Sequence, residues 1–385
     1  MKSKARILLL VGTAAAIVLG GLELFLRATG FSSPVWYQSD PVLGWTLRPG
    51  ASGWYNREGR ALVQVNSAGQ RDREHALQKP AGVYRIAVLG DAYAEAMQVP
   101  MESTYWAQLP GLLGSCGFQQ GKRIEVLNFG VRDYGTAQIY LTLERTAIRY
   151  APDLVLLQFD HDVRDNSPAL DPIRDRPFFR LEADGGLRLE TPANPGQSYV
   201  GRSSPARDLY RSLLERSRAL QFARERIQVR FTGVAHAKSE NGNEAGLDLP
   251  LLAPPRSASW DEAWRVTEAL IAKAGEIASQ HGAAMAVFTV PFAMEAHPDA
   301  ARRQRLQAKY GVADFTYSER RVVAFAREKG MLGIMLGPAM QARAVASGAP
   351  LYGFENRELG FGHWNQLGHR AAAEIIAREL CASRS

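Results

Sequence analysis

Cysteine is scarce in this chain, whose 385 residues include only Cys116 and Cys381. Two thiols are too few for the disulfide framework of a small secreted domain or for a four-cysteine zinc site. Acidic residues are also outnumbered, because 39 Asp and Glu stand against 46 Lys and Arg, for a net charge of +7. This balance predicts acidic partners such as anionic glycans or lipid head groups. We find no nucleic-acid-binding motif, so a membrane or envelope partner is favoured.

Charge is almost absent from Ile7 to Leu26, twenty mostly apolar residues in which only Glu23 is charged. This length spans a bilayer core, and Lys2, Lys4 and Arg6 ahead of it favour a cytoplasmic N-terminus. The alternative is a cleaved signal peptide, although the small residues of the run lie in its middle rather than at its end. No cysteine follows, which excludes a lipoprotein anchor. We therefore expect an uncleaved, single-pass transmembrane helix.

From residue 83 onward, short apolar runs alternate with helical patterns. The predicted strands are Ile86–Leu89, Ile124–Phe129, Leu154–Phe159, Ala284–Val290 and Gly333–Leu336. The predicted helices are Thr104–Leu113, Thr136–Tyr150, Trp260–Ser279, Tyr317–Lys329 and Leu367–Leu380. Such alternation predicts an α/β fold with a doubly wound, parallel five-stranded sheet.

The domain organisation follows from these patterns. Residues 1–30 form a cytoplasmic tail and anchor, 31–82 a β-containing lead-in, and 83–385 the main domain, with an insertion at about 167–256. Within the insertion we predict a loop from Pro168 to Gln197, one amphipathic helix from Asp208 to Arg230, and a polar loop from Lys238 to Gly246. Eight Arg fall between residues 202 and 230, either as a solvated face or as a basic surface for a glycan or membrane.

Four polar motifs follow predicted strands or open the last helix. They are Gly90-Asp91-Ala92, Gly130 to Gln138, Phe159 to Asn166, and Gly362 to His369. Together they resemble the four blocks of the SGNH (GDSL-type) hydrolases. More narrowly, the chain resembles the membrane-anchored branch associated with O-acylation of cell-envelope polysaccharides. The resemblance implies a flavodoxin-like sheet and a periplasmic domain on a bacterial inner membrane.

Most catalytic residues of that family are replaced. Ala92 stands at the position of the nucleophilic serine, Asp133 at that of an oxyanion-hole glycine, and His161 at that of an oxyanion-hole asparagine. His363 is retained, but Gly360 and Phe361 stand where its aspartate partner is expected. Alanine has no lone pair with which to attack an ester, and a carboxylate near the oxyanion has the wrong sign. We therefore expect that restoring serine alone recovers little activity.

These replacements favour a pseudoenzyme that binds or scaffolds an envelope polysaccharide or its O-acylation machinery, in which a membrane-bound acyltransferase is a candidate partner. The alternative is an active esterase or O-acyltransferase on envelope glycans with a non-standard site. No cofactor is implied.

Further polar residues lie near these positions. We expect Asp91, Asp162, Trp364 and Asn365 to contact a ligand, while Asp91 is also a candidate helix cap. If two His and nearby carboxylates converge, they could hold a first-row metal, but no ligand spacing supports such a site and none is predicted.

The resemblance also bears on the two cysteines. In a sheet of order 2-1-3-4-5 the first and last helices pack on the same face. Cys116 follows the first of these helices and Cys381 ends the last. Because an oxidising periplasm permits the bond, we predict a Cys116–Cys381 disulfide.

Overall fold

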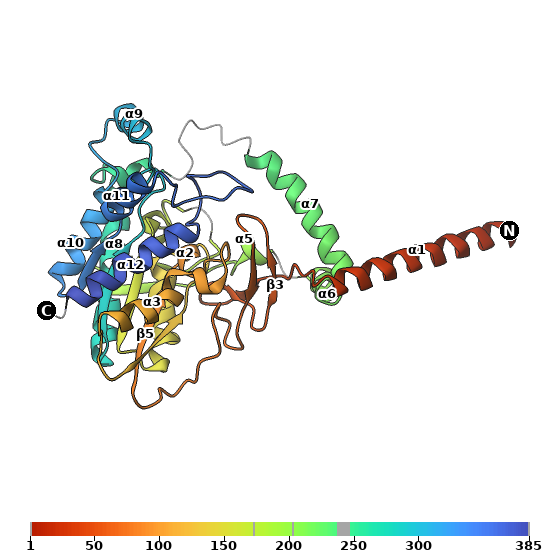
Figure 1. The fold of residues 1–385 in the computed structure, drawn as a ribbon, viewed down its shortest axis with the longest axis horizontal. Coiled ribbons are helices and arrows are strands. Elements are labelled where there is room, and N and C mark those ends of the chain that lie inside the picture. Colours follow the sequence, from red (N-terminus) through yellow and green to blue (C-terminus); the bar gives the residue numbers. More distant parts are fainter. Residues whose placement is uncertain (1, 172–173, 202–203, 237–246, 384–385) are drawn as a thin grey trace.

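A computed structural model describes residues 2–171, 174–201, 204–236 and 247–383 (Figure 1). Its central sheet has the order β11-β10-β7-β5-β6, and every pair in it is parallel. The strands are β5 (Val83–Leu89), β6 (Arg123–Asn128), β7 (Leu154–Phe159), β10 (Ala284–Thr289) and β11 (Leu332–Met335). β5 and β7 are buried along their whole length, as strands covered on both faces must be. The predicted fold class is confirmed.

Helices cover both faces of this sheet. One face carries α3 (Tyr105–Ser115), α11 (Gly337–Ser347) and α12 (Gln366–Ala382). The other carries α4 (Thr136–Arg145), α8 (Ala258–Gln280) and α10 (Tyr317–Glu328). Shorter elements connect them: α2 (Ala92–Glu95), α9 (Ala300–Tyr310) and the 3-10 turns η1 (Met101–Ser103), η2 (Ala147–Tyr150), η3 (Asp162–Asn166) and η4 (Leu249–Leu252).

A disulfide joins Cys116 at the end of α3 to Cys381 near the end of α12, with their Cα atoms 6.4 Å apart. The two helices share one hydrophobic core, in which Leu113 and Leu380 are both buried. The bond therefore lies on the face and at the helix ends that the sequence predicts for it.

The lead-in consists of two antiparallel hairpins. β1 (Tyr37–Asp40) pairs with β2 (Gly44–Leu47), and β3 (Ser52–Tyr55) pairs with β4 (Ala61–Gln64). Arg71, which follows them, is buried and donates to the carbonyls of Glu95, at 2.7 Å, and Val99, at 2.5 Å. A buried guanidinium with these partners fixes the lead-in beside the α2 turn.

The insertion differs from the prediction in two places. The expected loop from Pro168 to Gln197 contains a hairpin, β8 (Phe178–Leu181) and β9 (Leu187–Glu190), and ends at α5 (Gln197–Val200). The expected single helix is two, α6 (Pro205–Arg216) and α7 (Arg218–His236). The break lies at Ser217, which has an extended backbone. The loop predicted from Lys238 to Gly246 lies outside the described residues.

α1 (Lys2–Ala28) projects away from the rest of the molecule (Figure 1). Its stretch Leu9–Ala28 has a mean hydropathy of 2.1 and is 6% buried. By length and composition it is sufficient to cross a membrane, a test that a signal sequence also passes.

Candidate functional site

The turn after β5 places Ala92 at the carboxyl edge of the sheet, where ligands of open α/β sheets bind. Gly90 is required there, because a Cβ at this position would lie 2.7 Å from Oε1 of Gln158. Asp91 caps α2 by accepting a hydrogen bond of 3.0 Å from the Tyr93 amide. Ala92 is 4% exposed, and its side chain is a methyl group, which cannot act as a nucleophile.

Two carboxyl groups lie beside this turn. Asp91 is buried, accepts a hydrogen bond from Gln158 and is hydrogen-bonded to Asp160. Burial raises the pKa of Asp160 well above its usual range, and the neighbouring Asp91 raises it further. Asp160 is half-buried, and two carboxyl groups in contact repel each other when both are ionised, so the contact favours a state in which one of them keeps its proton. Asp160 lines a large cleft, whereas Asp91 lies beneath its lining and is in position to order the turn.

Asp133 does not face that cleft, which corrects the electrostatic expectation for the oxyanion region. Its backbone has φ +57°, a conformation that glycine favours. Its carboxylate accepts a hydrogen bond from the Tyr199 hydroxyl and lies 3.5 Å from Nε of Arg132. Arg132 lines the cleft in its place. A guanidinium, not a carboxylate, is therefore the charge that this segment presents to a ligand.

His161 is held as a neutral ring. Its Nδ1 lies 2.8 Å from the Ser318 hydroxyl, and the ring stacks on Phe292 with centroids 3.6 Å apart. Burial lowers the pKa of His161 to about 3. Neighbouring Asp162 is buried and accepts a hydrogen bond of 2.6 Å from the Thr136 hydroxyl, and burial raises its pKa to about 7. Asp162 therefore fastens the third block to the start of α4 and does not line the cleft.

His363 has a carboxylate partner after all. The Glu58 carboxylate, from the β3–β4 turn, accepts from the His363 amide at 2.7 Å and lies 2.5 Å from its Nδ1. Burial opposes ionisation of Glu58, but the hydrogen bonds and charge of His363 outweigh it and lower the pKa of Glu58. A carboxylate on Nδ1 holds the proton there and leaves Nε2 as the basic nitrogen. The expectation that His363 lacks an orienting acid was wrong, because the acid comes from the lead-in.

A cleft of about 1030 Å³ opens over these groups. It is lined by Tyr55, Arg57, Glu58, Tyr93, Arg132, Asp160, His161, Arg164, Leu247, Asp248, Pro291, Phe292, Ala293, Arg357, Glu358, Phe361, Gly362 and His363. The structure therefore brings together two of the predicted residues, His161 and His363, with Asp160 and Glu58, which the sequence did not single out. The position of Asp160 beside two predicted residues was a usable signal for it, whereas Glu58 carried none.

Two residues expected to contact a ligand have structural roles instead. Trp364 is fully buried and packs against Tyr93, with ring centroids 4.8 Å apart. Asn365 caps α12 by accepting from the amides of Leu367, at 3.0 Å, and Gly368, at 3.1 Å. Neither residue lines the cleft, because the last block continues directly into a core helix.

Metal binding finds no support in the described part of the chain, where no group of three or more His, Cys, Asp or Glu is placed to hold an ion. The set considered for a metal, Asp91, Asp133, His161 and His363, does not converge, because His161 faces Ser318 and Asp133 faces Tyr199.

Comparison with known proteins gives structural similarity alone. No family model matches the chain, and no curated protein matches it either. An acetylxylan esterase from Geobacillus stearothermophilus is similar, with 15% identity, a TM-score of 0.37, and coverage of 77% of this chain and 94% of that one. A second acetyl xylan esterase is 11% identical, with a TM-score of 0.39 and coverage of 78% of this chain and 98% of that one. An alpha/beta hydrolase from the metagenome of Lake Arreo, Spain, is 12% identical, with a TM-score of 0.37 and coverage of 78% of this chain and 96% of that one. These values assign neither a family nor an activity to this chain.

Proposed function

We propose that this chain is a membrane-tethered protein of the bacterial cell envelope whose cleft binds an acidic polysaccharide without forming an acyl-enzyme. The observation that carries the proposal is Ala92 beside an intact cleft of about 1030 Å³. A methyl group cannot attack an ester, so the covalent route of a serine hydrolase is closed. A cleft of this size exceeds what a single small molecule needs and suits a short stretch of polymer.

The aromatic lining suits sugar rings. Tyr55, Tyr93, Phe292 and Phe361 all border the cleft. Flat apolar faces next to a few fixed polar groups are the usual construction of a site that orients a small ligand. Tyr93 is held in place, because its hydroxyl donates to the Gly362 carbonyl at 3.3 Å. We infer that Tyr93, the half-buried member of this set, meets the apolar side of a sugar unit, whereas Tyr55, Phe292 and Phe361 are buried and shape the cleft wall.

The charged lining favours an acidic polymer. Four guanidinium groups border the cleft, from Arg57, Arg132, Arg164 and Arg357, and four carboxyl groups do as well. Three of those carboxyls are already engaged. Glu58 is bonded to His363, Asp248 pairs with Arg164, and Asp160 is hydrogen-bonded to Asp91. Guanidinium groups recognise carboxylates through paired hydrogen bonds. Because Arg132 already pairs with Asp133 and Arg164 with Asp248, Arg357 is the natural contact for a uronate group.

One observation favours a second candidate, ester hydrolysis without a covalent intermediate. The Glu58–His363 pair borders the same cleft and leaves Nε2 able to remove a proton from a bound water. In this alternative, water attacks an O-acyl carbonyl, the acyl–oxygen bond breaks, and the proton held by His363 passes to the sugar oxygen. A role for the protein beside a membrane-bound acyltransferase is compatible with either candidate.

The binding proposal is tested by calorimetric titration with an oligouronate and a neutral oligosaccharide of equal length. Arg357 is exposed, and its Nε donates to the carbonyl of Arg57 at 2.7 Å, so Arg357→Gln leaves the fold intact. We expect this variant to bind the oligouronate about tenfold more weakly, the typical effect of losing one charged hydrogen bond.

The matched control is Arg123→Gln, which removes the same charge from an exposed position at the opposite end of the sheet. It should bind like the unmodified protein. Equal weakening by both substitutions, or a preference for the neutral oligosaccharide, would contradict the proposal.

A further inference from the structure

The one charged residue of the apolar span is bonded to the insertion. The Glu23 carboxylate accepts hydrogen bonds from the amides of Arg218, at 3.0 Å, and Ala219, at 2.9 Å, and from the Ser217 hydroxyl, at 3.0 Å. These are free donors at the start of α7, where a carboxylate is most favourable. One turn later, Arg27 donates to the Arg216 carbonyl at the end of α6, at 2.6 Å. The α6–α7 corner is therefore fixed to the last turns of α1.

The residues that leave α1 also pack on α7. Phe31 and Phe222 make an edge-to-face contact with ring centroids 5.6 Å apart. The amide of Ser33 donates to Gln221 Oε1 at 2.9 Å, and Arg224 donates to the Pro34 carbonyl at 3.0 Å. Figure 1 shows α6 at the base of α1 and α7 leaving the same point at an angle to it. If Leu9–Ala28 crosses a bilayer, this corner lies at the bilayer surface.

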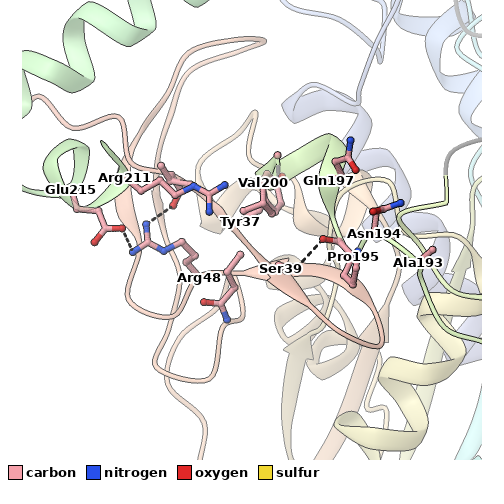
Figure 2. Close-up of a pocket in the computed structure, with 13 residues that line it drawn as sticks. Tyr37, Ser39, Arg48, Ala193, Asn194, Pro195, Gln197, Val200, Arg211 and Glu215 are labelled. Carbon is pink, nitrogen blue, oxygen red and sulfur yellow. Dashed lines mark hydrogen bonds and ion pairs between the residues drawn. The ribbon is translucent and has the colours of Figure 1, made fainter. Parts of the chain in front are cut away.

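One face of α6 is already covered by the rest of the protein. Leu214 is buried, and Glu215 pairs with Arg48 of the lead-in at 2.8 Å. Figure 2 shows Glu215 paired with Arg48 at the wall of a pocket of about 490 Å³, which Arg211 also lines. This contact fixes the rotation of α6 about its own axis.

The opposite face of α6 is apolar and exposed. Leu209 is 62% exposed and Leu213, one turn later, is 46% exposed. At 3.6 residues per turn, Leu209, Leu213 and Arg216 share a face that points away from Leu214. Tyr210 is 47% exposed at the margin of this face. Exposed leucines flanked by arginine and tyrosine are the composition of helices that lie in the interface of a membrane.

We propose that α6 docks on an anionic phospholipid bilayer, with Leu209 and Leu213 at the boundary between head groups and acyl chains and with arginines on the phosphates. The proposal rests on α1 crossing the membrane, as the proposed function assumes. The bilayer is favoured over a protein partner because the α6–α7 corner, directly after this exposed face, is bonded to the last turns of the apolar span through Glu23 and Arg27. Anionic lipid would also be an acidic partner for the many arginines of this segment.

Docking of α6 would also position the cleft relative to the membrane. On α7, Glu225 accepts a hydrogen bond of 3.4 Å from Asn56 of the β3–β4 turn. The next two residues, Arg57 and Glu58, line the cleft. The same helix thus connects the membrane end of the molecule to the cleft wall, so the cleft is held near the bilayer surface, where a polymer emerges from the membrane.

The test uses the full chain in two sets of nanodiscs, one with doxyl lipids that quench near the glycerol level, to report on position 213, and one with doxyl lipids that quench near the bilayer centre, to report on position 18. Both native cysteines are in the disulfide, so a single new cysteine takes a fluorescent label. Leu213→Cys reports on α6 and Val18→Cys on the middle of the span. Val345→Cys is the matched control, because Val345 is 50% exposed on α11, far from α1. In discs of mixed phosphatidylcholine and phosphatidylglycerol, we expect labels at positions 18 and 213 to be quenched, and the label at 345 to keep its full signal.

Each other outcome overturns the proposal in a distinct way. Quenching at 18 but not at 213 leaves the anchor in place and refutes docking of α6. Quenching at neither position refutes the anchor as well. Equal quenching at 213 in pure phosphatidylcholine refutes the requirement for anionic lipid. Energy transfer between labels at 213 on two copies would show that a second copy covers this face. Titration of the oligouronate in the same discs tests the proposed function independently of all four results.

Discussion

Ala92 and His363 differ in what each could contribute to ester hydrolysis. At Ala92 the reactive oxygen is missing, whereas His363 keeps a carboxylate partner, Glu58, 2.5 Å from its Nδ1. Arg132 lines the cleft and Asp133 does not, because the Asp133 carboxylate is bonded to the Tyr199 hydroxyl. Little recovery from a restored serine was expected for two reasons, a carboxylate near the oxyanion and a missing acid partner for His363. The structure removes both reasons. Tyr93, next to Ala92, packs on His363 with ring centroids 5.3 Å apart, so a serine at position 92 would lie near a histidine that keeps its orienting acid.

Ala92→Ser should consequently gain measurable hydrolysis of an aryl acetate and react with a fluorophosphonate probe. The gain should stay below that of a complete hydrolase, because the sequence resemblance implies an asparagine at the position of His161 as donor to the oxyanion. The matched variant Ala92→Ser/Glu58→Gln keeps the serine and removes the charge that stabilises the His363 cation, and it should be at least about tenfold slower. If the two variants react equally, Glu58 does not act through His363.

Glu295 and Glu319 are a second buried acidic pair, away from the cleft lining. They are 2% and 0% exposed, and Glu319 accepts a hydrogen bond of 3.2 Å from the Gly337 amide. Burial raises the pKa of Glu319 to about 7, and burial with the Glu319 charge raises that of Glu295 well above its usual range. The folded state therefore holds protons that the unfolded chain releases near pH 4 to 5. The contribution of the pair to the free energy of unfolding therefore falls as the pH rises from 4 to 5 up through 7.

Glu319→Gln should remove much of the stability loss at high pH, while its side-chain oxygen still accepts the hydrogen bond from the Gly337 amide. Each unit of pKa difference corresponds to about 1.4 kcal/mol, so the variant should melt several degrees above the unmodified protein at pH 8 and close to it at pH 5. Thermal unfolding at the two pH values measures the effect. A variant that is equally destabilised at both would show that Glu319 is ionised and stabilising in the fold.

Among the elements, those of the central sheet follow from local patterns. Leu154–Phe159 is a strand with the predicted limits. In an α/β fold, a short apolar run bounded by polar residues forms a central strand that is buried on both faces. Tyr317 begins α10 as predicted. α9 and α11 were not predicted, since α9 carries few apolar residues and α11 begins directly after a strand at Gly337-Pro338.

Other elements depended on contacts with distant parts of the chain. The predicted helix from Asp208 to Arg230 divides at Ser217, whose neighbours bond to Glu23 and Arg27. Nothing in the local periodicity marks that point, because the break serves a junction nearly two hundred residues away in sequence.

Glu23→Ala should release this junction. Loss of a carboxylate cap costs about 1 kcal/mol, and here two amides and a hydroxyl lose their partner together. Hydrogen exchange in the full chain should show faster exchange of the Arg218 and Ala219 amides. The control Glu328→Gln, in which an exposed carboxylate at the end of α10 is neutralised, should leave both unchanged. Unaltered exchange in Glu23→Ala would mean that α7 holds its first turn without α1.

At the scale of the whole molecule, topology was the most predictable property. Sheet order placed α3 and α12 on one face, and the Cys116–Cys381 disulfide follows from that placement. The site was less predictable. His161 and His363 stood in recognisable blocks, whereas Glu58 lies 305 residues from His363 and reaches it only because the lead-in folds over the cleft. Pairwise contacts of this kind leave no mark in local sequence.

The disulfide closes most of the chain, since its cysteines are 265 residues apart. Chain entropy alone would give a loop of this length at most about 6 kcal/mol of stabilisation, and measured values are usually lower. Cys116→Ser/Cys381→Ser should therefore melt well below the unmodified protein. Reductant should lower the melting temperature of the unmodified protein and leave that of the variant unchanged. Insensitivity of the unmodified protein to reductant would show that the bond contributes nothing to stability.

The most direct test of the central claim follows binding and chemistry in one sample. The unmodified protein is mixed with an O-acetylated oligouronate, and both complex formation and released acetate are measured over time. We predict saturable binding, weakened by Arg357→Gln, with acetate release no faster than in buffer. Acetate release by the unmodified protein that disappears in His363→Ala would contradict the account and establish the non-covalent esterase in its place.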